Sequence, residues 1–178
     1  MPIDVLGENP DQRALRLWIT AGLAIPEVAA LHGDAGYLLN NMIAKYTLAG
    51  DSYRISVGAL REFEQQGIDL AQSYTRRTFY GLRGGKNPFI YEHAVPAGVV
   101  RAALLDGSAV EERVAGVLGS AGVVAVLLRT EDARLREAGL SQKMPSGWQL
   151  GDDPLARYGA VGIKLSTECL KVHGAICR

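Results

Sequence analysis

The run from Gly122 to Leu128 limits the fold of this chain more than any other segment. It is a continuous series of β-branched and aliphatic residues, which is typical of a strand buried on both faces. Residues 88–91 form a second, shorter strand-like run. Because only these runs combine strand-type composition with flanking breakers, the sequence predicts an α+β fold, mostly helical, with a small two- or three-stranded sheet near residues 88–92 and 122–129.

Helical patterns dominate the rest of the chain. Residues 1–80 place apolar side chains such as Leu15 and Ile19 on one helix face, and we expect them to form a helical scaffold. Residues 86–140 hold both predicted strands and form the candidate core, and residues 141–178 are a C-terminal extension. With 178 residues and 48% hydrophobic content, the chain can bury a core as a single domain.

The formal charges cancel, since 19 basic residues balance 19 acidic ones. A site for a polyanion must therefore be a local patch. The two cysteines, Cys169 and Cys177, lie near the C-terminus, which favours a reducing cytoplasm over a disulfide-bonded secreted framework. Because the sequence has no apolar stretch of about 18 residues and residues 1–4 do not resemble a signal peptide, we expect a cytoplasmic protein without a membrane association.

One local patch lies between residues 71 and 90, where four cations and no acid occur: Arg76, Arg77, Arg83 and Lys86. Arginine binds phosphate through two hydrogen bonds, and the nearby aromatic rings can stack on exposed bases. The segment therefore predicts contacts with nucleic acid, with DNA as the first choice. A solvated helix end followed by a glycine-rich turn remains an equal alternative.

The predicted strand at residues 88–91, the first of the two along the chain, leads into the series Glu92-His93-Ala94-Val95-Pro96. A carboxylate can hold a hard cation while a neighbouring imidazole takes a proton from water. We therefore take Glu92 as a candidate metal ligand and His93 as a candidate general base. The alternative is structural, with His93 hydrogen-bonded to a neighbouring backbone group and Glu92 merely solvated.

A helix is expected at residues 131–137, directly after the Gly122–Leu128 run, and Asp132 falls in its first turn. This order of elements resembles the ββα-metal fold of HNH-type endonucleases, in which an acid-histidine pair and a proline end the first strand. The resemblance implies that Glu92 and a helix residue, here Asp132, hold the metal and that His93 is the general base. The family usually has a histidine in the helix, and carboxylates there suit Mg²⁺, with Mn²⁺ as a substitute.

The C-terminal extension holds two secondary candidates. Asp153 before Pro154 predicts a helix start, and the helix places Arg157 and Tyr158 on one exposed or half-exposed face. These residues could contact a phosphate or a base. The alternative, which the sequence favours, is an ion pair between Arg157 and a neighbouring acid, Asp152 or Asp153.

Cys169, His173 and Cys177 recur at a spacing of four, which would place them on one face if the segment were helical. Three ligands on one helix do not complete a tetrahedral zinc site. The role of the two cysteines therefore stays open.

Two classes of function remain. The first is a metal-dependent nucleic-acid phosphodiesterase, HNH-like and encoded by a phage or mobile element, in which Arg76, Arg77, Arg83 and Lys86 hold the backbone. The second is a non-catalytic factor that binds nucleic acid or an intracellular protein, such as an anti-defence or regulatory protein on a degenerate nuclease-like or helical scaffold. Convergence of Glu92, His93 and Asp132 would favour the first, and a buried His93 without a ligand would favour the second. The sequence leaves open whether the protein is an enzyme, and it does not reveal the oligomeric state.

Overall fold

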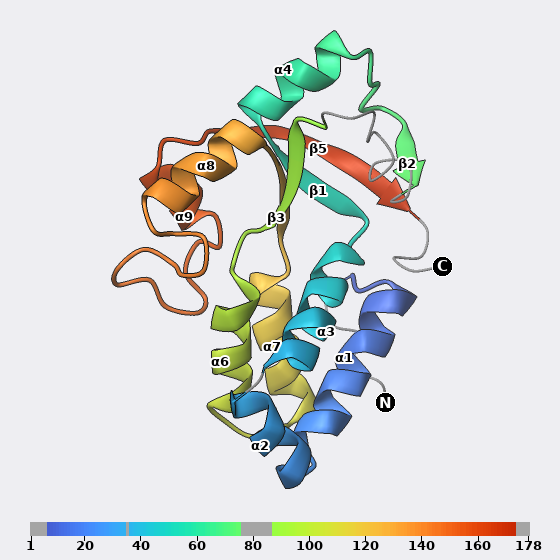
Figure 1. Cartoon of the computed structure of the whole chain (residues 1–178). Helices are drawn as coiled ribbons and strands as arrows, with labels where there is room; N and C mark the ends of the chain where they lie inside the picture. The colour runs from blue at the N-terminus through green and yellow to red at the C-terminus, as the bar shows by residue number, and fades with distance from the viewer. Residues whose placement is uncertain (1–6, 35, 76–86, 174–178) are drawn as a thin grey trace.

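A computed structural model describes residues 7–34, 36–75 and 87–173 of the chain (Figure 1). The helices are α1 (Pro10–Leu23), α2 (Pro26–Asp34), α3 (Tyr37–Leu48), α4 (Val57–Gln65), α6 (Ala97–Leu105), α7 (Glu111–Ala121), α8 (Arg129–Glu137) and α9 (Ala156–Ala160). The strands are β1 (Ser52–Ser56), β2 (Ser73–Thr75), β3 (Phe89–His93), β4 (Val124–Leu128) and β5 (Leu165–His173).

The strands form one five-stranded mixed sheet in the order β2-β5-β1-β4-β3. β1 is parallel to β4 and antiparallel to β5, while β2 is parallel to β5 and β3 is antiparallel to β4. The two expected strands correspond to β3 and β4. The prediction of a small two- or three-stranded sheet is nevertheless wrong, because β1, β2 and β5 extend it.

The missed strands have a physical explanation. β1 lies inside the segment that was expected to be a helical scaffold, and it is only five residues long. In β5, the alternating burial of Leu170 and Val172 marks a strand, whereas the spacing of Cys169 and His173 also fits a helix. These two residues therefore lie on a strand, and Cys177 lies outside the described residues.

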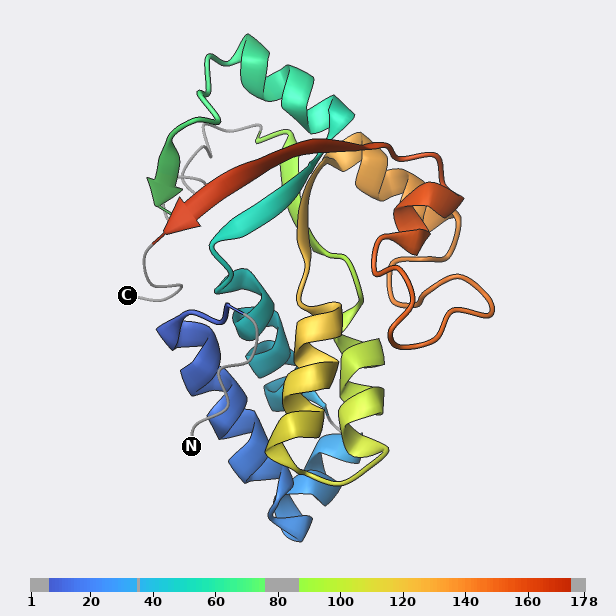
Figure 2. The ribbon, with the colours of Figure 1, turned by 180° about the vertical axis from the view of Figure 1, so that it is seen from behind.

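A helical bundle lies at one end of the sheet (Figures 1 and 2). Helices α1, α3, α6 and α7 share a core that includes Ile19, Ile43, Leu104 and Leu118. Strand β1 follows α3 and β4 follows α7, so the chain passes twice from the bundle into the middle of the sheet. Figure 2 shows α2 at the end of the bundle farthest from the sheet.

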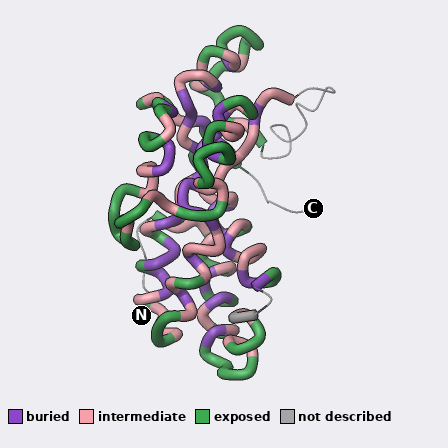
Figure 3. Tube along the Cα trace, turned by 60° about the vertical axis from the view of Figure 1, so that its left-hand side comes forward, coloured by how far each residue is buried: buried purple, intermediate pink, exposed green. Residues whose placement is uncertain are grey.

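Both faces of β4 are covered, as the apolar run predicts. Figure 3 shows buried stretches inside the molecule and exposed ones along its outer edges. Because side chains alternate along a strand, one face of β4 presents Val124 and Val126, and the other presents Ala125 and Leu127. The first face shares a cluster with α4 through Phe63. The opposite face shares a cluster with residues of α8 and α9.

Glu131 links the start of α8 to the start of α4 through two hydrogen bonds. Its Oε2 accepts hydrogen bonds from the Leu128 backbone N–H at 2.9 Å and from the Ser56 hydroxyl at 2.5 Å. Ser56 in turn caps α4 by accepting a hydrogen bond from the Ala59 backbone N–H at 2.9 Å. The Glu131 carboxylate thus has a structural role, whereas the adjacent Asp132 makes neither of these contacts.

Candidate functional site

Strand register separates the side chains of Glu92 and His93. Glu92 pairs with Ala125 across the antiparallel β3–β4 ladder, and His93 pairs with Val124. Paired residues share a face of the sheet, and successive residues point to opposite faces. Glu92 therefore faces α8 and α9, whereas His93 faces the side covered by α4.

Glu92 lies in a cluster of charged groups between β3, α8 and α9. Its carboxylate accepts a hydrogen bond from the guanidinium of Arg157 and forms an ion pair with it. Burial raises the pKa of Glu92, the positive charge of Arg157 opposes that rise, and the negative charge of Asp132 adds to it. The structure thus brings Glu92, Asp132, Arg157 and Tyr158 into one neighbourhood.

Asp132 also has a partner on its own helix. Its Oδ2 lies 3.3 Å from Nε of Arg136, one turn later in α8. Its side chain is 14% exposed, and that of Glu92 is 18% exposed. Solvent therefore reaches both carboxylates only in part.

Arg157 is completely buried, and its guanidinium connects three segments. Nε donates to the carbonyl oxygen of Ala94 at 2.9 Å and Nη1 donates to that of Leu140 at 2.9 Å. Nη2 donates to the carbonyl oxygen of His93 as well as to Glu92. This arrangement cross-links the end of β3, the loop after α8, and α9.

The expectations for Arg157 and Tyr158 need correction. The sequence placed both on an exposed or half-exposed face and favoured an ion pair of Arg157 with Asp152 or Asp153, whereas both side chains are buried. The two acids instead accept backbone hydrogen bonds, from Gln149 and Leu155 respectively. Spacing along the sequence cannot reveal a partner 65 positions away, which is where Glu92 lies.

Tyr158 lies beside Arg157 and is only 1% exposed. The Arg157 guanidinium carbon is 5.4 Å from the centre of its ring, within the range of a cation–π contact. Within the described residues, the hydroxyl has no hydrogen-bond partner of normal geometry. Burial raises the pKa of Tyr158; the positive charge of Arg157 opposes that rise and the Glu92 and Asp132 carboxylates add to it, so the phenol stays neutral.

His93 is half-buried and carries a neutral imidazole. Its Nδ1 is buried and has no hydrogen-bond partner within residues 7–34, 36–75 and 87–173. Burial, together with the positive charge of Arg157, lowers the pKa of His93 to about 4. At neutral pH the ring is uncharged, and it is a weaker base than an ordinary histidine.

A metal site is not assembled in the described part of the chain, where no group of three His, Cys, Asp or Glu side chains is placed to hold an ion. Mg²⁺ often uses only one or two carboxylates and completes its shell with water and phosphate. Glu92 and Asp132 could therefore hold such an ion only as a pair, and binding of Mg²⁺ or Mn²⁺ there stays a prediction. The basic residues Arg76, Arg77, Arg83 and Lys86 all lie outside the described residues.

Sequence reasoning missed an open polar face on the sheet, on the side opposite to Tyr53, Leu170 and Val172. The strand register places the following residues on it: Ser52 and Arg54 of β1, Cys169, Lys171 and His173 of β5, and Ser73 and Thr75 of β2. We call this set the open sheet face. None of these residues is a carboxylate, but the same face continues through Ala125 of β4 to Glu92 of β3. The detectable signal was the alternation of apolar and polar residues from Leu170 to His173.

The cations of the open sheet face lack acidic partners among the described residues. Arg54 donates only weakly, from Nη1 to Sγ of Cys169 at 3.8 Å and from Nη2 to the carbonyl oxygen of Ser166 at 3.4 Å, and its buried Nε has no partner. Lys171 is exposed. Nδ1 of His173 lies 2.8 Å from the Ser73 hydroxyl, which joins β5 to the edge strand β2.

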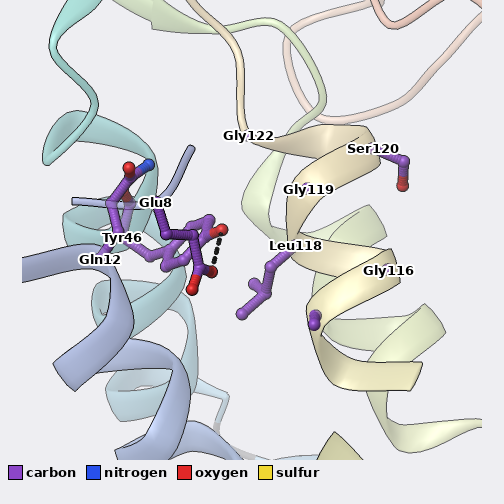
Figure 4. A pocket seen from close by; sticks show the side chains of 9 residues that line it. Glu8, Gln12, Tyr46, Gly116, Leu118, Gly119, Ser120 and Gly122 are labelled. Atoms are coloured by element: carbon purple, nitrogen blue, oxygen red, sulfur yellow. Dashed lines mark hydrogen bonds between the residues drawn. The ribbon is translucent and has the colours of Figure 1, made fainter. Parts of the chain in front are cut away.

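A cavity of about 480 Å³ lies in the helical bundle, between α7 on one side and Tyr46 of α3 and Glu8, which precedes α1, on the other (Figure 4). The Tyr46 hydroxyl donates to Glu8 at 2.7 Å, and Glu8 also forms an ion pair with the buried Arg16 at 2.9 Å. Burial and the Glu8 carboxylate raise the pKa of Tyr46. Glu8 is the one charged residue that lines the cavity in the described part of the chain, and it is already paired with Arg16 and Tyr46.

Comparisons with known proteins add no relative: no family model, curated protein or solved structure matches this chain. Within the described residues, no single helix is both long and apolar enough to cross a membrane. Helices α1 and α2 reach that length and composition only together, and they meet at a bend of 104°.

Proposed function

We propose that this protein is a non-catalytic, cytoplasmic factor that binds nucleic acid, DNA first, with phosphates held on the open sheet face. The observation that carries the proposal is the pair of cations Arg54 and Lys171, which have no carboxylate partner in the described part of the chain. Arginine, lysine and hydroxyl groups are the usual partners of backbone phosphates. A phage or mobile element is the proposed source, as the sequence suggests.

The open sheet face suits an extended polyanion. Neighbouring strands lie roughly 4.8 Å apart, and same-face residues recur about every 7 Å along a strand, so the cations and hydroxyls form a two-dimensional array. Arg54 lies beside Cys169 in the register, and Lys171 lies between Ser52 and Ser73. Arg76 and Arg77 directly follow Thr75, the last residue of β2, in the sequence.

Metal-dependent phosphodiester hydrolysis is the second candidate function. The proximity of Asp132 to Glu92 supports it, because two adjacent carboxylates can share a divalent cation. Two features favour the binding function instead. His93 faces the opposite side of the sheet from Glu92, and the Glu92 carboxylate is already engaged by a buried arginine.

Binding can be measured by fluorescence anisotropy with labelled single- and double-stranded DNA and RNA over a series of salt concentrations. Lys171→Glu and Arg54→Gln should each weaken binding and reduce the slope of log K against log salt by about 1 for each lost phosphate contact. Lys143→Glu is the matched control, since this exposed lysine lies in the loop after α8. Unchanged isotherms for both variants would exclude the open sheet face as the binding surface.

Two further measurements separate the remaining possibilities. Charge reversal at Arg76 and Arg77 tests the part of the prediction that lies outside the described residues. Incubation of the wild-type protein and His93→Ala with nucleic acid and Mg²⁺ or Mn²⁺ tests hydrolysis. Metal-dependent cleavage by the wild type that His93→Ala abolishes would replace the binding function with the phosphodiesterase.

A further inference from the structure

Large apolar side chains are exposed at one end of the helical bundle. Six of the eight exposed large apolar residues in the described chain fall between positions 17 and 38. They are Leu17 (43% exposed), Trp18 (72%), Ile25 (50%), Leu31 (72%), Tyr37 (78%) and Leu38 (59%). We call this set the apolar end surface. Its members belong to the second half of α1, to α2 and the turn before it, and to the start of α3, and Figure 1 draws α2 at the end of the bundle away from the sheet.

Helix α2 makes the apolar end surface unusual. No described residue of α2 is buried, although the helix contains Val28, Ala29, Ala30 and Leu31. A helix of nine residues is too short to be stable in water by itself, and it gains stability by packing an apolar face. Among the described residues, α2 packs chiefly against α1 and α3, and none of its side chains becomes buried. A further partner would supply the missing contact.

The charges near this surface limit what that partner can be. Residues 17–44 contain no lysine or arginine, and their acids are Glu27 and Asp34. Arg101 of α6 reaches the edge of the surface, where its guanidinium lies against Gly36. A helix that binds an anionic membrane surface needs a row of basic residues on its polar side, which this segment lacks. The apolar end surface likewise offers few charged side chains that an oppositely charged partner could bind.

The exposed area fits a symmetric protein interface. Large side chains have full areas of roughly 150–250 Å². At the exposed fractions given above, the six side chains leave about 700 Å² of accessible surface, close to the roughly 800 Å² that each partner contributes to a stable complex. Interfaces between identical chains are also the most apolar class, and a two-fold axis requires a patch that complements itself.

We propose that a second copy of this chain covers the apolar end surface, so that the protein is a symmetric homodimer built on α1, α2 and the start of α3. The arrangement leaves the open sheet face of each copy at the far end of the molecule. The dimer is independent of nucleic-acid binding, and its test contains no nucleic acid.

Sedimentation equilibrium of the full-length chain tests the proposal. The wild type should sediment in the micromolar range with twice the mass of the 19.1 kDa chain. Trp18→Glu and Leu31→Glu should each weaken dimerisation roughly tenfold or more, because a charge is buried at the centre of an apolar interface. Leu150→Glu is the control, since this exposed leucine lies in the loop before α9 and should leave the dimer unchanged.

A second measurement applies if a variant loses its fold. In a Trp148→Phe background, emission from Trp18 should shift to the red on dilution as the ring becomes exposed. A wild type that is monomeric throughout the micromolar range overturns the proposal. So does a dimer that persists in folded Trp18→Glu and Leu31→Glu, or a monomer that binds lipid vesicles through Trp18.

Discussion

The guanidinium of Arg157 pairs with the carboxylate of Glu92 from a position that is fully buried. The pair joins α9 to the end of β3, and further hydrogen bonds from Arg157 reach Ala94 and Leu140. A buried arginine that satisfies carbonyl groups on two segments primarily holds the fold. Residues that the sequence marked for chemistry thus also position the C-terminal extension against the sheet.

Removal of Arg157 should therefore cost stability. Arg157→Ala leaves Glu92 partly buried without its partner, and we expect a loss of roughly 3–5 kcal/mol in the free energy of unfolding. Urea denaturation measures this loss. Arg136→Ala removes an exposed ion pair with Asp132 and should cost less than about 1 kcal/mol. A double variant, Glu92→Leu with Arg157→Met, should recover most of the loss, and failure to recover it would point to the carbonyl contacts as the main contribution.

His93 should make stability depend on pH. Its pKa is about 4 in the folded protein against 6.5 when exposed, so the unfolded chain binds more protons between these values. Stability from this group is fully present above pH 6.5 and is lost as the pH falls towards 4, by on the order of 3 kcal/mol. The measurement is the difference in unfolding free energy between pH 7.5 and 4.5 for the wild type and His93→Gln. Equal differences in the two proteins would show that His93 does not titrate in this way.

Two helical glycines should respond in opposite ways to alanine. A Cβ at Gly58 in α4 would lie 2.8 Å from Oε1 of Glu131 and 3.1 Å from Cδ1 of Leu128, so Gly58→Ala should displace the carboxylate that caps α8 and destabilise the fold. A Cβ at Gly116 in α7 meets no atom within 4 Å. Gly116→Ala should therefore raise stability by about 0.5–1 kcal/mol. Thermal denaturation compares them, and a stabilised Gly58→Ala would show that Glu131 is free to move.

The sequence revealed those features that depend on local pattern. The Gly122–Leu128 run predicted a strand with two buried faces, and β4 has that environment. The sequence did not reveal β1 or β5. Their pairing joins Arg54 to Cys169 across 115 positions. In addition, the β1 run is short and the β5 run also fits a helix. The sequence singled out Glu92 and Asp132 as metal ligands, and Arg157 and Tyr158 as secondary candidates for contact with a phosphate or base. Their burial and mutual contacts depend on tertiary packing, which no local spacing encodes.

Cys169 offers an independent test of the open sheet face. It is a half-exposed free thiol that lies next to Arg54 in the β1–β5 register. Nucleic acid bound to this face would cover it, so the rate of alkylation by iodoacetamide should fall several-fold when DNA is added to a Cys177→Ser variant. High salt should restore the rate, because phosphate contacts weaken as counterions accumulate. Mass spectrometry of the labelled peptide gives the rate, and Lys171→Glu should lose the protection. Alkylation at the same rate with and without bound DNA would place the nucleic acid on another surface.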